Sequence, residues 1–292
     1  MVKGTPRALA FAIVVLLFPG TSAFAQMDLA GDWRALMHED RTERIPGPEL
    51  GEFFGIPIND AARWRAELWD ASIQTLPEWQ CRPHGADYIT RGPSPPRISK
   101  EVDPVSREIT AFHAEWLRSV DRPIYMDGRP HPSQNAAHSW GGFSTAQWVG
   151  DVLEISTTHL KEDYVRRNGL PRSDKATMTE FLIRNGDYLT WVTIVHDPVY
   201  LDAPFIRTTD HFLDRSQQVP PYPCEVVTEV DRPRGTVPHH LPGENPYLAE
   251  ASENLGIPFE ATMGGPETMF PEYRETLRRL MQAGSQGTQG AQ

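Results

Sequence analysis

The sequence predicts a mainly β protein, folded as an antiparallel barrel of roughly eight to ten strands with a few peripheral helices and a long C-terminal tail. Short runs rich in β-branched and aromatic residues recur along the chain between turn dipeptides, as is typical of strands. The links between these runs are too short for helical crossovers, so we expect antiparallel neighbours. The 27 prolines and 22 glycines favour turns and ordered loops over a helical bundle.

The clearest strand pattern lies in the middle of the chain, where hairpin turns separate the runs. Gly150-Asp151 and Asn185-Gly186 fit tight turns, because glycine and asparagine tolerate positive φ. The runs of this central part are 143–149, 152–158, 176–184, 188–196 and 205–213, and the weaker runs around it are 97–102, 108–117, 122–126 and 225–230. A closed barrel of this size leaves an interior large enough for one small ligand.

The first residues are typical of a secretory signal peptide. Lys3 and Arg7 precede an apolar stretch, and Ala25 ends a cleavage site of small residues. We therefore expect residues 1–25 to be removed and the mature protein, starting at Gln26, to be periplasmic or secreted. The apolar stretch is too short to cross a bilayer, and no other segment approaches the roughly 20 apolar residues required, so no integral membrane segment is expected after cleavage.

The remaining chain divides into three parts. A β-barrel domain is expected at 26–231, and an extension at 232–282 should carry short helices packed on the barrel. The tail at 283–292 is rich in Gly, Gln and Ser, and we expect it to be disordered. Within the barrel domain, Asn59 is a plausible helix N-cap. The residues expected on the buried face of this helix are Ala61, Trp64, Leu68 and Ala71.

Charge restricts the class of partner. The chain has 28 Lys and Arg against 39 Asp and Glu, a formal net charge of −11. The signal peptide holds Lys3 and Arg7 and no acidic residue, so its removal changes the charge to −13. This acidic balance argues against nucleic acid and against anionic membrane surfaces as partners, and leaves a small-molecule ligand as the expected partner.

Cys81 and Cys224 are the two cysteines of the chain. In an oxidising compartment they most simply form one disulfide. The alternative is a metal site that uses Cys81 with His84, but a single Cys-x-x-His pair lacks the second ligand pair of such sites. We therefore predict the disulfide, and neither a metal nor a cofactor.

One long polar connection, residues 158–175, interrupts the hairpins. Its basic residues are Lys161, Arg166, Arg167, Arg172 and Lys175. Because long loops between short hairpins are often functional, Lys161, Arg166 and Arg167 are candidates for ligand contacts, in a lid or an anion-binding rim. The alternative is a solvated surface loop.

Histidine is the candidate for catalysis, because it exchanges protons near neutral pH. His138, His159 and His196 lie at the ends of predicted strands, and hairpin-connected strands can bring such ends onto one rim. We therefore name these three as catalytic candidates, with hydrogen-bonded structural histidines as the alternative. The sequence contains no His-x-His or His-Glu-x-x-His spacing for a metal and no Gly-x-Ser-x-Gly elbow of an α/β-hydrolase.

Two predicted strands carry charged residues on one face together with apolar ones. Glu180 and Arg184 share one face of the first strand, and Arg207 and His211 share one face of the second; Glu180, Arg207 and His211 are the candidates for an internal cluster. If these faces point inward, the three side chains form an internal polar cluster that contacts a ligand, whereas an exposed salt-bridge ladder is the alternative. Trp140 is a further candidate ligand contact, because tryptophans can line a pocket as well as a core. The tryptophans are Trp33, Trp64, Trp69, Trp79, Trp116, Trp140, Trp148 and Trp191.

Short blocks spread over the chain combine Pro, Gly and charged residues. They are Ile45-Pro-Gly-Pro-Glu-Leu, Gln80-Cys-Arg-Pro-His, Asp127-Gly-Arg-Pro-His-Pro, Trp148-Val-Gly-Asp-Val-Leu, Thr157-Thr-His-Leu-Lys, Arg166-Arg-Asn-Gly-Leu-Pro-Arg-Ser-Asp and Asp197-Pro-Val-Tyr-Leu. Together they resemble an uncharacterised family of exported bacterial proteins. The opening Gly31-Asp32-Trp33 is also similar to that of lipocalin-like barrels, in which the Trp closes the base. The resemblance implies export and a lipocalin-like (calycin-type) barrel, and it transfers no activity or catalytic residue.

Three functions fit these observations. The first is an exported barrel that binds a small, largely apolar molecule in its interior. The second is an enzyme on the same barrel, a hydrolase, lyase or isomerase that uses His/acid chemistry at the mouth. The third is a structural or interaction protein of the envelope. A wide apolar cavity favours the first, a pocket lined by Trp and His with a perturbed pKa the second, and a filled barrel with an exposed apolar patch the third.

Overall fold

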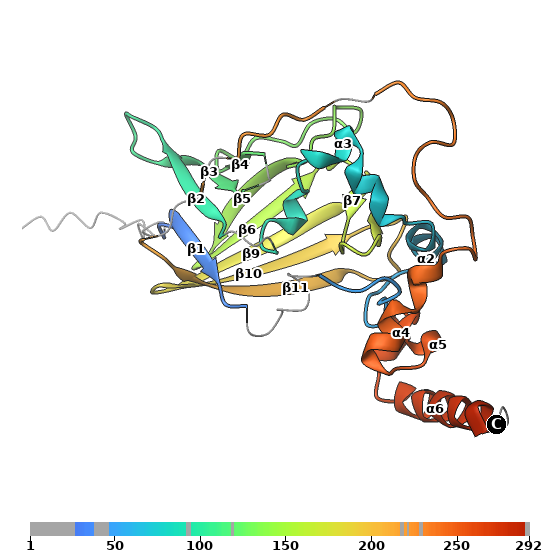
Figure 1. The fold of residues 1–292 in the computed structure, drawn as a ribbon. Helices are drawn as coiled ribbons and strands as arrows, with labels where there is room; N and C mark the ends of the chain where they lie inside the picture. Colours follow the sequence, from blue (N-terminus) through green and yellow to red (C-terminus); the bar gives the residue numbers. More distant parts are fainter. Residues whose placement is uncertain are drawn as a thin grey trace, which may run out of the picture.

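The computed structural model describes residues 27–37, 47–91, 95–117, 120–216, 219–220, 222–227 and 230–289. In this part of the chain nine strands close into a barrel, in the order β1-β11-β10-β9-β6-β5-β4-β3-β2 (Figure 1). The strands are β1 (Gly31–Ala35), β2 (Arg97–Val102), β3 (Ile109–Glu115), β4 (Arg122–Tyr125), β5 (Phe143–Val149), β6 (Val152–Thr158), β9 (Thr177–Asn185), β10 (Tyr188–His196) and β11 (Phe205–Leu213). The prediction of a mainly β barrel is confirmed.

One strand pair corrects the prediction of a wholly antiparallel barrel. β4 and β5 are parallel, with Ile124 opposite Ser144. The chain between them, residues 126–142, returns to the starting end of β4 before β5 begins, and we call this segment the strap. The strap connects two parallel strands without a helix, whereas the prediction assumed that parallel neighbours need a helical crossover. The run 225–230 is also not a strand in its described residues, 225–227 and 230.

The hairpins follow from local sequence, as predicted. Gly150 and Gly186 have φ values of 62° and 61°, the left-handed conformation that their tight turns require. β9 and β10 pair over their whole length, with Glu180 opposite Thr193. Alternate residues of β9 are buried, including Glu180, so the face that carries this charge points into the barrel. On the outside, the exposed apolar side chains of these strands and the adjoining β11 are Ile183, Tyr188, Ile206 and Phe212.

Large apolar side chains from around the ring fill much of the barrel interior. The buried ones that form this core are Leu29, Trp33, Tyr88, Ile89, Ile98, Phe112, Ala114, Trp116, Ile124, Leu153, Ile155, Leu182, Leu189 and Trp191. Trp33 is fully buried, and its indole N–H donates to the Leu29 carbonyl at 2.9 Å. A second apolar cluster lies where the segment 53–66 covers the other end of the barrel.

Helix α2 (Asp60–Glu67) covers that end with small side chains (Figure 1). The Asn59 side chain accepts a hydrogen bond from the Ala62 N–H at 3.0 Å, which confirms the predicted N-cap. The buried residues are Ala62 and Ala66, whereas Trp64 is 60% exposed. The prediction that Trp64 lies on the buried face of the helix is therefore wrong. The helix packs on the barrel through Ala62 and Ala66, because the small alanine side chain allows a close approach. The short helices η1 (Ala71–Thr75), α3 (Pro77–Gln80) and η2 (Ala86–Tyr88) follow.

The C-terminal extension contacts the segment before and within α2. The Asn245 amide donates to the carbonyls of Glu67 and Trp69, and the Thr262 carbonyl accepts from the Phe53 N–H. The helices of the extension are η3 (Pro246–Ala249), α4 (Glu250–Leu255), α5 (Phe259–Thr262), η4 (Pro266–Met269) and α6 (Tyr273–Gln289). α6 points away from the barrel (Figure 1) and runs into the tail segment 283–292, where no helix is expected from the sequence.

Cys81 and Cys224 form a disulfide, with their Cα atoms 5.5 Å apart. This confirms the predicted pairing and attaches the linker after β11 to the end of α3. In the described ranges, no helix has the length and apolar character needed to cross a membrane. The expected signal peptide, residues 1–25, and His38 lie outside the described residues.

Candidate functional site

Glu180 belongs to a buried ion pair inside the barrel. Its carboxylate accepts hydrogen bonds from the Arg122 guanidinium, with one pair of atoms at 3.2 Å, and from the Trp191 indole at 2.8 Å. Arg122 also donates to Ser144 at 3.0 Å and to Thr157 at 2.7 Å. Sequence analysis missed Arg122. Its alternation with the buried Ile124 along β4 is the pattern that identifies it as inward-facing.

Arg207 and His211 are also buried on the inner face of β11. Arg207 donates to the carbonyl of Val165 at 2.7 Å and to that of Asp87 at 3.3 Å. The His211 ring lies 6.2 Å from the Trp191 ring, between centroids. All three expected members of the internal cluster, Glu180, Arg207 and His211, therefore lie inside the barrel. Arg207, however, donates to backbone carbonyls of segments that are not part of the barrel strands.

The polar connection after β6 is fastened down by its own arginines. It contains the two-stranded ladder of β7 (Asp163–Tyr164) and β8 (Pro171–Arg172). Arg166 is buried and donates to the carbonyl of Glu52 at 2.7 Å and to its carboxylate at 2.8 Å. Arg167 is exposed. The segment is thus a packed cover of the barrel end and not a solvated loop, and the ligand-contact candidates Lys161 and Arg167 are exposed on it.

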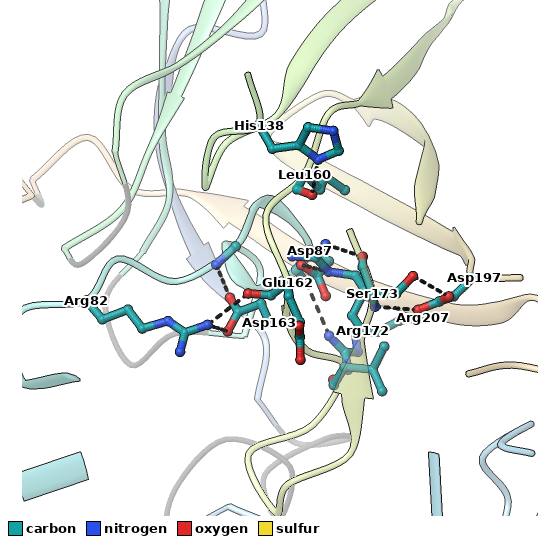
Figure 2. Close-up of polar contacts among 12 residues, drawn as sticks. Arg82, Asp87, His138, Leu160, Glu162, Asp163, Arg172, Ser173, Asp197 and Arg207 are labelled. Carbon is teal, nitrogen blue, oxygen red and sulfur yellow. Dashed lines mark hydrogen bonds and ion pairs between the residues drawn. The ribbon is translucent and has the colours of Figure 1, made fainter. Parts of the chain in front are cut away.

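A buried charge network lies beneath this cover (Figure 2). The Arg172 guanidinium donates to Asp87 at 3.2 Å, and Arg207 reaches the backbone of the same residue. Arg82 lies 3.5 Å from the carboxylate of Asp163. The Asp163 carboxylate also accepts the N–H of Gly85 at 2.7 Å. The side chains of Asp87, Asp163, Arg172 and Arg207 are all buried.

Gly85 allows these charges to approach one another. A Cβ atom at this position would lie 2.7 Å from Arg172 and 2.9 Å from Asp163. Burial removes water from the Asp163 carboxylate and raises its pKa from 3.8 to about 6, even though Arg172 and Arg82 favour the charged form. Asp163 therefore takes up a proton in the native protein under mildly acidic conditions.

The Asp163 carboxyl should make the free energy of unfolding depend on pH. Between pH 4 and 6 the native state keeps a proton that the unfolded state has lost, so stability falls as pH rises through this window. In Asp163→Asn this titration is absent. The stability of the variant relative to wild type should rise by up to about 3 kcal/mol from pH 4 to pH 7, measured by urea denaturation.

Asp127→Asn is the matched control for that measurement. Its side chain is exposed, and a hydrogen bond from Arg129 lowers the pKa of the Asp127 carboxyl below 3.8, so its contribution is lost only as pH falls below about 4. Between pH 4.5 and 7 its stability relative to wild type should stay constant. A constant difference for Asp163→Asn as well would contradict the assignment.

Arg82 is held between two indole rings. Its guanidinium carbon lies 4.0 Å from the centroid of the Trp79 ring and 4.4 Å from that of Trp140. It also donates to the Glu162 carbonyl at 2.8 Å. Stacking of this kind fixes both rings through cation–π attraction. Arg82 thereby joins α3, the strap and the cover segment.

Beside Arg82 lies a cavity of about 520 Å³, which we call the aromatic chamber. Its lining includes the aromatic side chains of Trp69, Trp79 and Tyr164 and the charged side chains of Arg65 and Glu162. The Tyr164 ring lies 5.0 Å from Trp69 and 5.9 Å from Trp79, so the three rings form one continuous aromatic surface. This pocket lies at the barrel end, outside the barrel interior.

Four of the charged side chains around the aromatic chamber have an oppositely charged neighbour, and a fifth, Asp70, accepts a hydrogen bond from the Ser72 N–H. Arg65 pairs with Glu162 at 3.2 Å, and Arg82 is close to Asp163. The Tyr164 hydroxyl oxygen is buried and has no hydrogen-bond partner in the described part of the chain. Burial raises the pKa of this hydroxyl, so it stays protonated and can donate. A smaller cavity of about 100 Å³ adjoins the chamber and is lined in part by Arg167.

The three catalytic candidates do not come together. His138 and His159 lie near the strap with ring centroids 5.3 Å apart. His138 Nδ1 bonds to the Leu160 carbonyl at 2.9 Å, whereas His159 bonds through Nδ1 to the Thr158 hydroxyl on β6 and through Nε2 to the Ser133 carbonyl on the strap. His196 is exposed at the end of β10, on its outer face. Within the described residues, no group of three or more His, Cys, Asp or Glu side chains is placed to hold a metal.

Trp140 and Lys161 meet on the surface near the strap. The Lys161 ammonium lies 5.1 Å from the Trp140 ring centroid, at a groove also lined by Tyr125 and Phe143. Trp140 contacts Arg82 of the chamber lining, whereas the tryptophans that themselves line the chamber are Trp69 and Trp79.

We compared the chain with protein-family models, curated proteins and solved structures. No protein-family model, curated protein or solved structure matches the chain. The function proposed below is therefore inferred from the geometry of the site.

Proposed function

We propose that the protein binds a small, neutral, partly aromatic molecule in the aromatic chamber. The observation that carries this proposal is the continuous surface of Trp69, Trp79 and Tyr164 at a cavity of about 520 Å³. Ligand pockets are typically apolar and aromatic, with few polar groups and volumes of about 300–1,000 Å³.

Two features support a neutral ligand in the chamber over an apolar ligand inside the barrel. Much of the interior is taken up by buried side chains such as Trp33, Phe112 and Trp191. In the chamber, Arg65 pairs with Glu162 and Arg82 lies close to Asp163, so these opposite charges largely offset one another.

Trp79→Ala should weaken binding of the uncharged fluorescent probe N-phenyl-1-naphthylamine at least tenfold, which corresponds to about 1.4 kcal/mol. The substitution removes one aromatic wall of the chamber. Fluorescence titration of mature protein at pH 7.5 gives the dissociation constant. Trp64→Ala is the matched control, because Trp64 is 60% exposed on α2 and does not line the chamber. Equal dissociation constants for the two variants would contradict the proposal.

We further propose export through the predicted signal peptide, and a lipocalin-like character for the barrel. Export rests on Lys3, Arg7 and the site at Ala25, and intact-mass measurement tests it by locating the mature N-terminus. The lipocalin-like character rests on the opening Gly31-Asp32-Trp33, whose tryptophan is fully buried. His/acid catalysis remains a weaker alternative, because His138 and His159 are engaged in hydrogen bonds.

A further inference from the structure

Two histidines fasten the strap to the barrel through a chain of hydrogen bonds. His131, on the strap, contacts the hydroxyls of Thr145 on β5 at 2.9 Å and Thr158 on β6 at 2.7 Å. The Thr158 hydroxyl also contacts His159 Nδ1 at 2.7 Å. His159 Nε2 returns to the strap at the carbonyl of Ser133, at 2.8 Å. We call these five residues the histidine clasp.

The Ser133 carbonyl fixes the direction of donation along this series of hydrogen bonds, because a carbonyl oxygen can only accept a hydrogen bond. His159 Nε2 must donate to it, so in a neutral ring Nδ1 accepts the hydroxyl hydrogen of Thr158. The Thr158 oxygen then accepts from His131 Nδ1, and His131 Nε2 accepts from Thr145. Neutral imidazoles therefore satisfy every group of the clasp with a single arrangement of protons.

A second proton on either ring disrupts this arrangement. Protonated His159 donates from both nitrogens, so the hydroxyl hydrogen of Thr158 loses its acceptor. If His131 is also protonated, two positive rings face one hydroxyl oxygen at 2.7 Å each and repel one another. Burial lowers the pKa of His131, and His159 lowers it further, so the neutral form is favoured near pH 7.

The surroundings do not neutralise this charge. His138 adds a third ring, 5.3 Å from His159 between centroids. Asp174 and Lys175, in the segment just before β9, are charged residues that line the same pocket as the three histidines, and their opposite charges largely cancel. Within the described ranges, none of the three histidines forms an ion pair with a carboxylate.

The strap also reaches the aromatic chamber. Near its end, Trp140 contacts the Arg82 guanidinium, which also contacts the ring of Trp79 in the chamber wall. The Trp140 carbonyl accepts the N–H of Ala86 at 3.2 Å, which sets the ring beside Arg82. A strap released from the barrel therefore removes one of the two indoles that hold Arg82 in place.

We propose that the histidine clasp makes ligand binding in the aromatic chamber dependent on pH, with release under mildly acidic conditions. This inference rests on the proposed function and adds its regulation. With neutral rings the strap is fastened, Trp140 covers Arg82, and the Trp79 wall is fixed. Protonation unfastens the strap and frees Arg82, and the chamber loses its ordered wall.

The test compares binding of N-phenyl-1-naphthylamine, which is uncharged at both values, at pH 7.5 and pH 5.0. Wild type should bind at least tenfold more weakly at pH 5.0. The variant His131→Gln/His159→Gln should show a difference at least threefold smaller than that of wild type, because its clasp cannot titrate and only other groups, such as Asp163 at the chamber, still take up a proton. His196→Gln is the matched control, since this exposed histidine is outside the clasp, and it should behave as wild type.

Amide hydrogen exchange gives a readout that needs no ligand. The Ser139 N–H donates to the His159 carbonyl and the Lys161 N–H to the Ser139 carbonyl, both at 2.9 Å. Their protection factors should fall at pH 5.0 in wild type, with far-UV circular dichroism unchanged, and should not change with pH in the double variant. The pH profile of these two amides therefore reports the strap directly.

The outcomes separate the two proposals. Equal affinities at the two pH values in wild type, a pH dependence as large in the double variant as in wild type, or constant protection of Ser139 and Lys161 would each overturn the clasp mechanism while leaving ligand binding in place. Absence of probe binding at pH 7.5 would overturn the proposed function and this inference with it.

Discussion

Glu180→Ala should lower the free energy of unfolding by about 3–5 kcal/mol, because it leaves the Arg122 guanidinium charged and unpaired inside the barrel. Both side chains are almost completely buried, so water cannot replace the lost carboxylate. The substitution also removes the acceptor of the Trp191 indole. Urea denaturation at pH 7.5, with the disulfide intact, measures the loss.

Two further variants separate the buried charge from the loss of side-chain volume. Glu154→Ala, at a partly buried site on the outer face of β6, should change stability by less than about 0.5 kcal/mol. Arg122→Met/Glu180→Met should be more stable than Glu180→Ala, because it removes both charges and retains apolar volume. A loss below about 1 kcal/mol in Glu180→Ala would show that the ion pair contributes little.

The hairpins were predictable because their determinants are local. Gly150 and Gly186 occupy turns that require positive φ, and the alternation along β9 and β10 follows from the two-residue period of a strand. The parallel pair of β4 and β5 was not predictable in this way. It depends on the path of the strap, which no periodicity records, and on hydrogen bonds between His131 and two other strands.

The candidate site was predictable only in its parts. Sequence analysis gave Trp69 and Trp79 among eight possible pocket residues and had no basis for selecting them. Their partner Tyr164 comes from a segment about 90 residues further on, and only the fold brings the three rings together. The role of Gly169 also becomes visible only in the fold, because a Cβ atom there would lie 2.5 Å from the Trp69 side chain. The disulfide was predictable, since a chain with two cysteines allows only one pairing.

Cys81→Ser/Cys224→Ser should lower the free energy of unfolding by about 2–5 kcal/mol. The bond joins residues 143 positions apart, so in the chain-entropy model its removal releases a large closed loop in the unfolded state. Urea denaturation of the variant and of wild type, with and without dithiothreitol, measures the effect. Reduced wild type should match the variant, and the variant should not respond to the reductant.

The same variant should also lose affinity for N-phenyl-1-naphthylamine. Cys81 lies between Trp79 and the stacked Arg82, so the disulfide holds the segment that forms one wall of the aromatic chamber. A second attachment, the ion pair between Arg232 and Glu78, holds the linker to α3 independently of the disulfide. We therefore expect binding about three- to tenfold weaker and not abolished. Unchanged affinity together with the expected loss of stability would show that the disulfide acts on the unfolded chain alone.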